Sequence, residues 1–297
     1  MNYKIMKAKH ILFLLLIIFS ISCKNNVYKP SHLRKLTDDE LIDAEINNRQ
    51  FNQKHAVYKN QIGEIISLDS IRKINYPCFN QFVFDKYVNE NNEVIEIIIR
   101  PATQHDLEVK AKISLAFFKE PEIEIVDIDC NKIGETLDTI HFLDQEMRRN
   151  GNSIDYEIEH QCLNKVISII NECGMPTLNE VNEQQMTTIW LIFQHTHHNI
   201  MKKYFPLLLK SAKNGDLKMA HIALMLDRIL MNEGKPQQYG SQVQAGCKSK
   251  WELYNLAKPE MVNQRRSEMG LGPLEDYLKE YGIDFNVKQI GLSEVID

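Results

Sequence analysis

The residues best able to do chemistry lie in the second half of the chain, inside an otherwise apolar helical pattern. Residues 222–231 are mostly apolar, and Asp227 and Arg228 interrupt them. Consecutive residues on a helix point about 100° apart, so each charge needs a separate partner or access to water. Two roles are open. Asp227 acts as a general base with Arg228 as an anion clamp, or Asp227 is held by a neighbouring donor to fix packing while Arg228 reaches solvent.

A second group of polar residues is Gln194-His195-Thr196-His197-His198, which directly follows the apolar residues 189–193. His195 continues an apolar face and is the third catalytic candidate, with a hydrogen-bonded core histidine as the alternative. A metal shared by His195 and His198 would need a carboxylate such as Asp227 nearby. No acid accompanies these histidines in the sequence, so we predict no metal site.

A third group lies in the segment 236–242, after the helix-ending Gly234. Amides and a phenol on a tight glycine turn can donate and accept hydrogen bonds, so they are suited to a polar ligand. The same residues could instead tie down the backbone of their own loop. The ligand-binding candidates are Gln194, Gln238, Tyr239 and Gln242.

Asp144 and Arg148, four residues apart on one helix face, are expected to form a weak surface ion pair.

The pattern that positions these residues changes character near residue 130. Before it, a capping box at Thr37 predicts a helix over 37–56, and runs rich in Val, Ile, Phe and Tyr predict strands over 81–88, 93–100, 108–118 and 122–128. After it, the period is helical, with predicted helices over 135–149, 154–173, 182–203, 207–213, 216–233, 251–256, 259–269 and 274–281. Pro206 predicts a break or kink close by. We expect an α+β protein with a strand-rich segment, residues 36–130, followed by a predominantly helical domain, residues 131–297.

The N-terminus has the layout of a lipoprotein signal peptide over residues 1–22. Three lysines precede the nine apolar residues 11–19, and Ser22 precedes Cys23. Nine apolar residues cannot span a hydrocarbon core that requires about 20, which favours cleavage. We expect Cys23 to carry the lipid that anchors the protein in the cell envelope, with residues 23–35 as a polar tether. An ordinary secretory signal and an uncleaved anchor are the alternatives.

Composition and cysteine content limit the function of the mature chain. Without the three signal lysines it has 32 basic and 40 acidic residues, so we expect no nucleic-acid partner. Five cysteines remain after lipidation, namely Cys78, Cys130, Cys162, Cys173 and Cys247. The number is odd, so at least one lacks an intramolecular partner. Cys162 and Cys173 fall in one predicted helix, too far apart for a disulfide. Buried inert thiols are the expectation.

Together these residues resemble the bacterial domain of unknown function 6624 over residues 136–281. The resemblance is carried by Asp144-Gln145, Arg148, Asn164, Gly174-Met175-Pro176, the run Trp190–His195, Asp227-Arg228, Gln238-Tyr239-Gly240-Ser241-Gln242, Arg265-Arg266 and Gly270-Leu271. Members of the family commonly have an acid two positions after the histidine, where this chain has His197. The resemblance brings no established activity or cofactor.

Two functions from different classes follow from these residues. In the first, the helical domain has a pocket for a small polar ligand, with His195 or Asp227 as general base. In the second, the protein is a non-catalytic interaction module of the envelope, and the same residues form a buried network that fixes helix packing.

Overall fold

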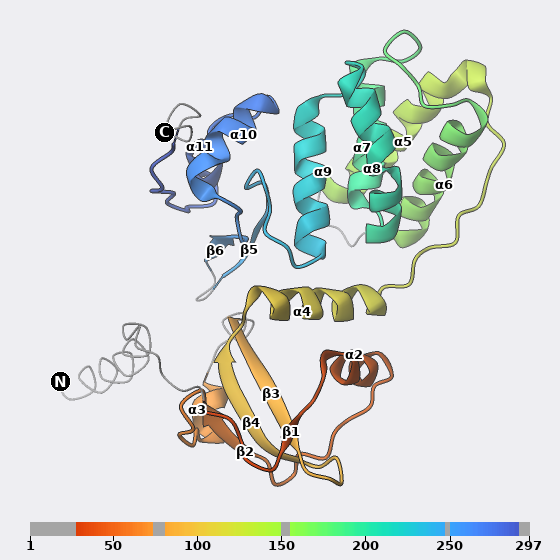
Figure 1. Cartoon of the computed structure of the whole chain (residues 1–297). Coiled ribbons are helices and arrows are strands. Elements are labelled where there is room, and N and C mark those ends of the chain that lie inside the picture. The colour runs from red at the N-terminus through yellow and green to blue at the C-terminus, as the bar shows by residue number, and fades with distance from the viewer. Residues whose placement is uncertain (1–27, 74–80, 150–154, 247–249, 291–297) are drawn as a thin grey trace, which may run out of the picture. The chain divides into compact units, whose positions relative to one another are not determined.

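The computed structural model describes residues 28–73, 81–149, 155–246 and 250–290 (Figure 1). The predicted signal peptide, Cys23, Cys78 and Cys247 lie outside these residues. The described residues fall into two compact units, one made of 28–37, 50–73 and 82–101, and the other of 38–49, 81 and 102–290. The fold is α+β, as the sequence predicts. Independent folding of the residues from 131 onward stays a prediction.

The first unit is built on a four-stranded mixed sheet with strand order β1-β3-β4-β2. Its centre is the predicted hairpin, in which β3 and β4 pair antiparallel across a turn closed by a hydrogen bond from Asn89 N to Glu93 O. β4 is rich in β-branched residues and buries Ile97, Ile98 and Ile99. The bounds are β1 Arg34–Lys35, β2 Val57–Asn60, α3 Leu68–Arg72, β3 Phe82–Val88 and β4 Val94–Pro101.

Two predicted strands after this hairpin are wrong. Residues 108–117 belong to helix α4, Gln104–Phe117, which begins at a capping box in which Thr103 and Asp106 exchange side-chain and backbone hydrogen bonds. Residues 122–128 are extended but pair with no strand among the described residues. The helix predicted over 37–56 begins as expected and ends early, as α2, Asp38–Ile46.

The core of the second unit is a group of five helices around fully buried residues such as Leu137, Met186 and Phe193. The predicted helix 182–203 is two helices, because the chain turns at Thr196 and His197. The His197 side chain accepts a hydrogen bond from Asn199 N and caps the second helix. That helix runs through Pro206, so the break lies at 196–197 instead. The bounds are α5 Ile133–Arg149, α6 Tyr156–Glu172, α7 Glu183–His195, α8 His198–Lys213 and α9 Met219–Asn232.

The C-terminal part packs around a smaller core of Val262, Leu274 and Leu278. The predicted helix at 251–256 is wrong, because β6 pairs antiparallel with β5 over residues 251–253. The two later helices are confirmed. The bounds are β5 Val243–Ala245, β6 Trp251–Leu253, α10 Val262–Glu268 and α11 Leu274–Lys279.

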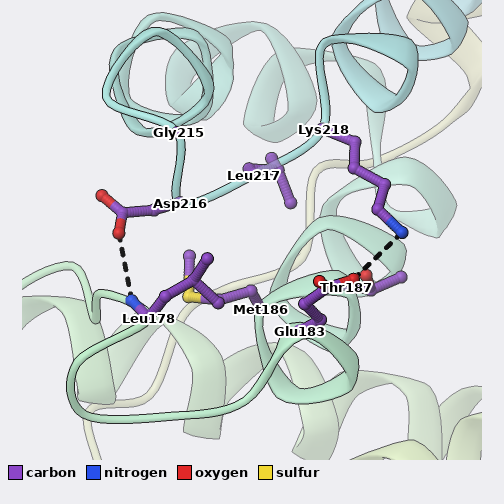
Figure 2. A pocket seen from close by; sticks show the side chains of 8 residues that line it. All are labelled: Leu178, Glu183, Met186, Thr187, Gly215, Asp216, Leu217 and Lys218. Atoms are coloured by element: carbon purple, nitrogen blue, oxygen red, sulfur yellow. Dashed lines mark hydrogen bonds and ion pairs between the residues drawn. The ribbon is translucent and has the colours of Figure 1, made fainter. Parts of the chain in front are cut away.

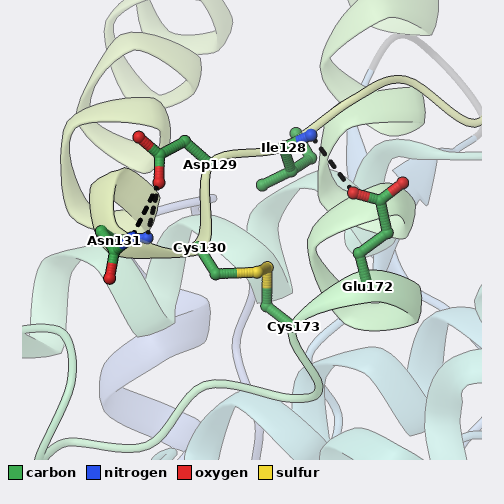
Figure 3. The surroundings of a disulfide bond; sticks show 6 residues. All are labelled: Ile128, Asp129, Cys130, Asn131, Glu172 and Cys173. Carbon is green, nitrogen blue, oxygen red and sulfur yellow. Dashed lines mark hydrogen bonds between the residues drawn. A yellow bond between two sulfur atoms is a disulfide. The ribbon is translucent and has the colours of Figure 1, made fainter.

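A disulfide joins Cys130 to Cys173, with 5.7 Å between their Cα atoms (Figure 3). The expectation of inert thiols is therefore wrong for these two residues and right for Cys162, which is buried and free. Cys162 and Cys173 are not paired, as helix geometry predicts. Sequence position did not reveal the pairing because its partners lie 43 residues apart.

Within the described ranges, no helix is long and apolar enough to cross a membrane.

Candidate functional site

A buried carboxylate on α5 forms the centre of the first candidate site. Leu137 and Ile140 are fully buried, and Asp144 continues their stripe at helical spacing with 1% of its surface exposed. Its Oδ1 lies 3.2 Å from Nδ1 of His195, the last residue of α7. A carboxylate can only accept, so Nδ1 donates and Nε2 of the neutral ring is left as an acceptor. Asp144 therefore fixes the tautomer and the orientation of His195.

Three further side chains hold this pair. Arg148 Nε donates to Asp144 Oδ1 over 3.0 Å, and Gln145 Nε2 donates to Asp144 Oδ2 over 3.0 Å. The second arm of Arg148 donates to Glu159 Oε1 over 2.7 Å. Burial would raise the pKa of Asp144, but the hydrogen bond from His195 and the charges of His195 and Arg148 outweigh it, so the pKa is lowered. The expectation of a surface ion pair between Asp144 and Arg148 is wrong, since the carboxylate is buried.

His195 lines a cleft of about 660 Å³. The walls come from α4, from the turn after it, from α6 and from the end of α9, and the histidines of the α7–α8 turn lie along it. Ser114, Tyr156 and Asn232 supply hydroxyl and amide groups, while Leu115 and Leu163 are apolar. This volume lies within the range found for small-molecule sites.

His198 also lines the cleft, but it has a different partner from His195. Its Nε2 lies 3.5 Å from Glu233 Oε1, and Glu233 also binds Lys202 and Lys235. Burial lowers the pKa of His198. Its Nδ1 is buried without a hydrogen-bond partner among the described residues. The two histidines therefore do not share a carboxylate.

Asp227 lies in a separate network and is fully buried. Its two oxygens accept hydrogen bonds from the backbone N–H groups of Gln238, Tyr239 and Ser241 and from the Ser241 hydroxyl, at 2.7 to 3.2 Å. Burial raises the pKa of Asp227, and these donors oppose that shift. Asp227 thus holds the loop 237–242 against α9.

Arg228 reaches the same loop by another route. Its Nε donates to Gln242 Oε1 over 2.7 Å, and Gln242 Nε2 donates to the Ser241 hydroxyl over 3.0 Å. The neighbouring charges on α9 are therefore joined through the loop and not to each other, as helix geometry requires. Arg228 is half-buried, and its guanidinium is hydrogen-bonded to Gln242. The predicted role of Arg228 as an anion clamp did not include this partner.

Two arginines of α10 complete the support of this loop. Arg265 Nε donates to Gln238 O over 2.8 Å, and Arg266 Nη1 donates to Tyr239 O over 2.7 Å. Gln237, fully buried, donates to the carbonyls of Gln242 and Tyr254. The loop backbone is thus held on both sides. The support comes mostly from side chains that the family signature contains.

The candidate residues therefore separate into two places. His195 lies at the cleft, whereas Asp227, Arg228, Gln238, Tyr239 and Gln242 belong to the loop network, and the cleft lining includes none of them. Gln194 is buried on α7, with its Oε1 unpaired among the described residues. Glu159 is the residue that the sequence analysis missed. Asp144 was misjudged although its position in an apolar stripe signals burial.

The described residues contain no group of three histidine, cysteine, aspartate or glutamate side chains placed to hold a metal ion. A second, smaller pocket of about 230 Å³ lies between the start of α7 and the turn before α9 (Figure 2). Its charges are paired locally: Asp216 accepts from Leu178 N over 3.0 Å, and Lys218 lies 3.1 Å from Glu183. We assign it no chemistry.

Comparison with known families matches residues 153–288 to a family of unknown function, DUF6624. These residues are similar to that family, and we call them the DUF6624 domain. The match confirms the resemblance that the sequence suggested, although it begins at 153 and not at 136. No curated protein and no solved structure matches the chain.

Within the DUF6624 domain the signature residues have two structural tasks. Asp227, Arg228, Gln242, Arg265 and Arg266 hold the loop 237–242. Asn164 of α6 accepts a backbone hydrogen bond from residue 124. His195 is the signature residue at the cleft, and its partner Asp144 lies just before the DUF6624 domain.

Proposed function

We propose that this protein binds a small polar ligand in the cleft of its helical unit and uses His195 as an acid–base group on that ligand. One observation carries the proposal: Nδ1 of His195 is held by a buried carboxylate, while the ring lines a cleft of about 660 Å³. Nε2 is then the atom left to take a proton from a bound molecule or return one.

The chemistry suits histidine because its charge changes near neutral pH. A buried carboxylate on the opposite ring nitrogen stabilises the imidazolium that forms when Nε2 takes a proton. Asp144 can do this because Arg148 and Gln145 hold it in place. The pair is thus pre-organised before any ligand binds.

A cleft-filling variant tests ligand binding. Leu163 lines the cleft and is 3% exposed, and Leu163→Trp would fill it. Phe142→Trp is the control, because Phe142 is 62% exposed and lies outside the cleft lining. Native mass spectrometry of protein purified from its own envelope should find a bound small molecule on wild type and on Phe142→Trp, and none on Leu163→Trp. Equal retention by all three proteins would refute the cleft as the binding site.

The cellular place that we propose is the envelope, with a lipid on Cys23 as the anchor. The signal-like N-terminus motivates this proposal, and the Cys130–Cys173 disulfide supports it, because structural disulfides persist mainly in oxidising compartments. Cells fed an alkyne fatty acid should label the wild-type protein and leave Cys23→Ser unlabelled. Equal labelling of both would contradict the anchor. A nucleic-acid partner is not part of the proposal, given the acidic charge balance.

The second candidate function is a non-catalytic interaction module. It is favoured by the loop network, because Asp227 is fully buried and all its hydrogen bonds go to the loop. In this alternative the cleft is a by-product of helix packing. A bound molecule lost only from Leu163→Trp would exclude it.

A further inference from the structure

Residues 118–129, which we call the strap, run along α6 in an extended conformation and pair with no described strand. Three backbone N–H groups of the strap donate to side chains of α6. Glu124 N donates to Asn164 Oδ1 over 3.2 Å, Val126 N to Ser168 Oγ over 2.9 Å and Ile128 N to Glu172 Oε2 over 3.2 Å. One step earlier, His160 Nε2 donates to Glu122 O over 2.7 Å.

The spacing of these contacts matches the geometry of both segments. Four residues of a helix advance about 6.0 Å, and two extended residues advance about 6.6 Å, so the two rows stay in step over several contacts. Asn164 and Ser168 are 5% and 0% exposed, and buried polar groups need hydrogen-bond partners. One face of α6 is therefore built to receive the strap backbone.

Both ends of the strap are fastened. At the C-terminal end the Cys130–Cys173 disulfide lies beside the last hydrogen bond, from Ile128 to Glu172 (Figure 3). At the N-terminal end His197 Nε2 donates to Phe118 O over 3.0 Å. Phe118, Lys119 and Pro121 line the cleft that contains His195. The N-terminal end of the strap, residues 118–121, thus forms part of the wall of that cleft.

We propose that the Cys130–Cys173 disulfide is a redox latch for the strap, and that its reduction releases the wall of the cleft. Cys130 is exposed, so a dithiol reductant can reach it. A thiolate of that reductant attacks one sulfur and displaces the other as a thiolate. Its second thiol then resolves the mixed disulfide. The protein gains two electrons and two protons as two thiols, and the reductant becomes a disulfide.

The effect of the latch on the cleft rests on the proposed function, whereas release of the strap does not. Strap release is measured without any ligand, so its failure can be told apart from failure of the proposed acid–base role. Glu124, Val126 and Ile128 supply the reporting amides. The internal control is the set of amides that Asp227 holds, at Gln238, Tyr239 and Ser241.

The experiment is hydrogen exchange of the purified protein before and after reduction by dithiothreitol, with complete reduction checked by alkylation and mass. We expect the three strap amides to exchange at least about tenfold faster after reduction, because opening of the strap is then local. The loop amides should change much less. Cys173→Ser should behave like reduced wild type, and Cys162→Ser, which removes a free thiol, should behave like oxidised wild type.

Two results would overturn the proposal. Unchanged strap exchange after complete reduction would mean that the hydrogen bonds to α6 hold the strap without the disulfide. An equal acceleration of strap and loop amides would mean that the disulfide supports the whole unit and is no latch. Hydrogen exchange of Ser168→Ala in the oxidised protein is a second measurement, because this variant removes one strap hydrogen bond while the disulfide stays closed.

Discussion

Two aspartates on helices illustrate how one residue type performs different tasks. Asp144 and Asp227 both interrupt apolar stripes, and both are buried. Asp144 meets the side chains of His195 and Arg148, and so orients an imidazole ring next to a cleft. Asp227 meets only N–H and O–H donors of one loop. The position in an apolar stripe is common to both residues. Their hydrogen-bond partners are what distinguish a carboxylate that positions a side chain from one that holds a loop.

Asp227→Asn should destabilise the protein. The amide replaces an acceptor oxygen by a donor that faces the N–H groups of the loop, so at least one of them loses its partner. We expect the free energy of unfolding to fall by about 1 to 3 kcal/mol. Urea unfolding followed by circular dichroism measures it, with Asp276→Asn as the control at an exposed ion pair. A variant as stable as wild type would show that Asp227 serves a ligand and not the loop.

His221 should make the protein sensitive to mild acid. Burial, aided by Lys218, lowers its pKa from 6.5 to about 4. Between these values the unfolded chain binds a proton that the folded protein does not, so stability is full above about pH 6.5 and falls as the pH drops toward 4. His221→Phe keeps a ring against Trp190, whose ring centroid lies 4.3 Å away. Its unfolding free energy should fall less between neutral pH and pH 4.5, and a loss equal to that of wild type would contradict the assignment.

At the scale of elements, glycines decide how closely helices approach. Gly234 ends α9 with φ +71° and faces the backbone of Leu107 in α4, and its carbonyl accepts from Gln104 Nε2 over 2.6 Å. Gly270 has φ +73° and open space around it. Comparing substitutions at these two glycines therefore distinguishes the cost of backbone strain from the cost of close packing.

Alanine at either glycine adds the strain of a left-handed residue, about 1 to 2 kcal/mol. Gly234→Ala must also push α4 away, because a backbone neighbour cannot rotate aside. We expect it to cost at least about 1 kcal/mol more than Gly270→Ala in urea unfolding. It should also loosen the α4 wall of the cleft. Equal costs would show that α4 does not depend on this contact.

The sequence predicted those elements whose signals are local. The hairpin of β3 and β4 and most helices of the second unit follow from periodicity and from glycine or proline at their ends. The prediction failed where tertiary contacts decide. The strap is extended because side chains of α6 bind its backbone, and β6 exists because β5 pairs with it. The capping box at Thr103 was a local signal that outweighed the β-prone residues after it.

The candidate site could be predicted only in part for the same reason. His195, Asp227 and Arg228 stand out as polar residues within apolar runs, so the sequence alone marks them as candidates. Their partners cannot be identified in this way, because Asp144 precedes His195 by 51 residues and the loop begins ten residues after Asp227. The sequence of one helix face does not indicate which loop or helix will pack against it.

At the scale of the whole molecule, the second unit combines a rigidly held loop with a cleft whose wall is fastened by a disulfide. Residues 104–129 supply α4 and the strap, and both contribute to the lining of the cleft together with the DUF6624 domain. The proposed site is therefore larger than the family domain. Its acid–base pair is completed by Asp144, which lies before residue 153.

The acid–base role of His195 is tested most directly by looking for chemistry that depends on it. A small-molecule extract of the envelope would be incubated with wild type and with His195→Gln, and both would be compared by untargeted mass spectrometry. His195→Gln keeps a polar side chain of similar length but cannot take a proton at neutral pH. We predict that wild type consumes at least one compound and forms a product, and that His195→Gln does neither. Identical extracts after both incubations, or equal conversion by both proteins, would contradict the proposed function.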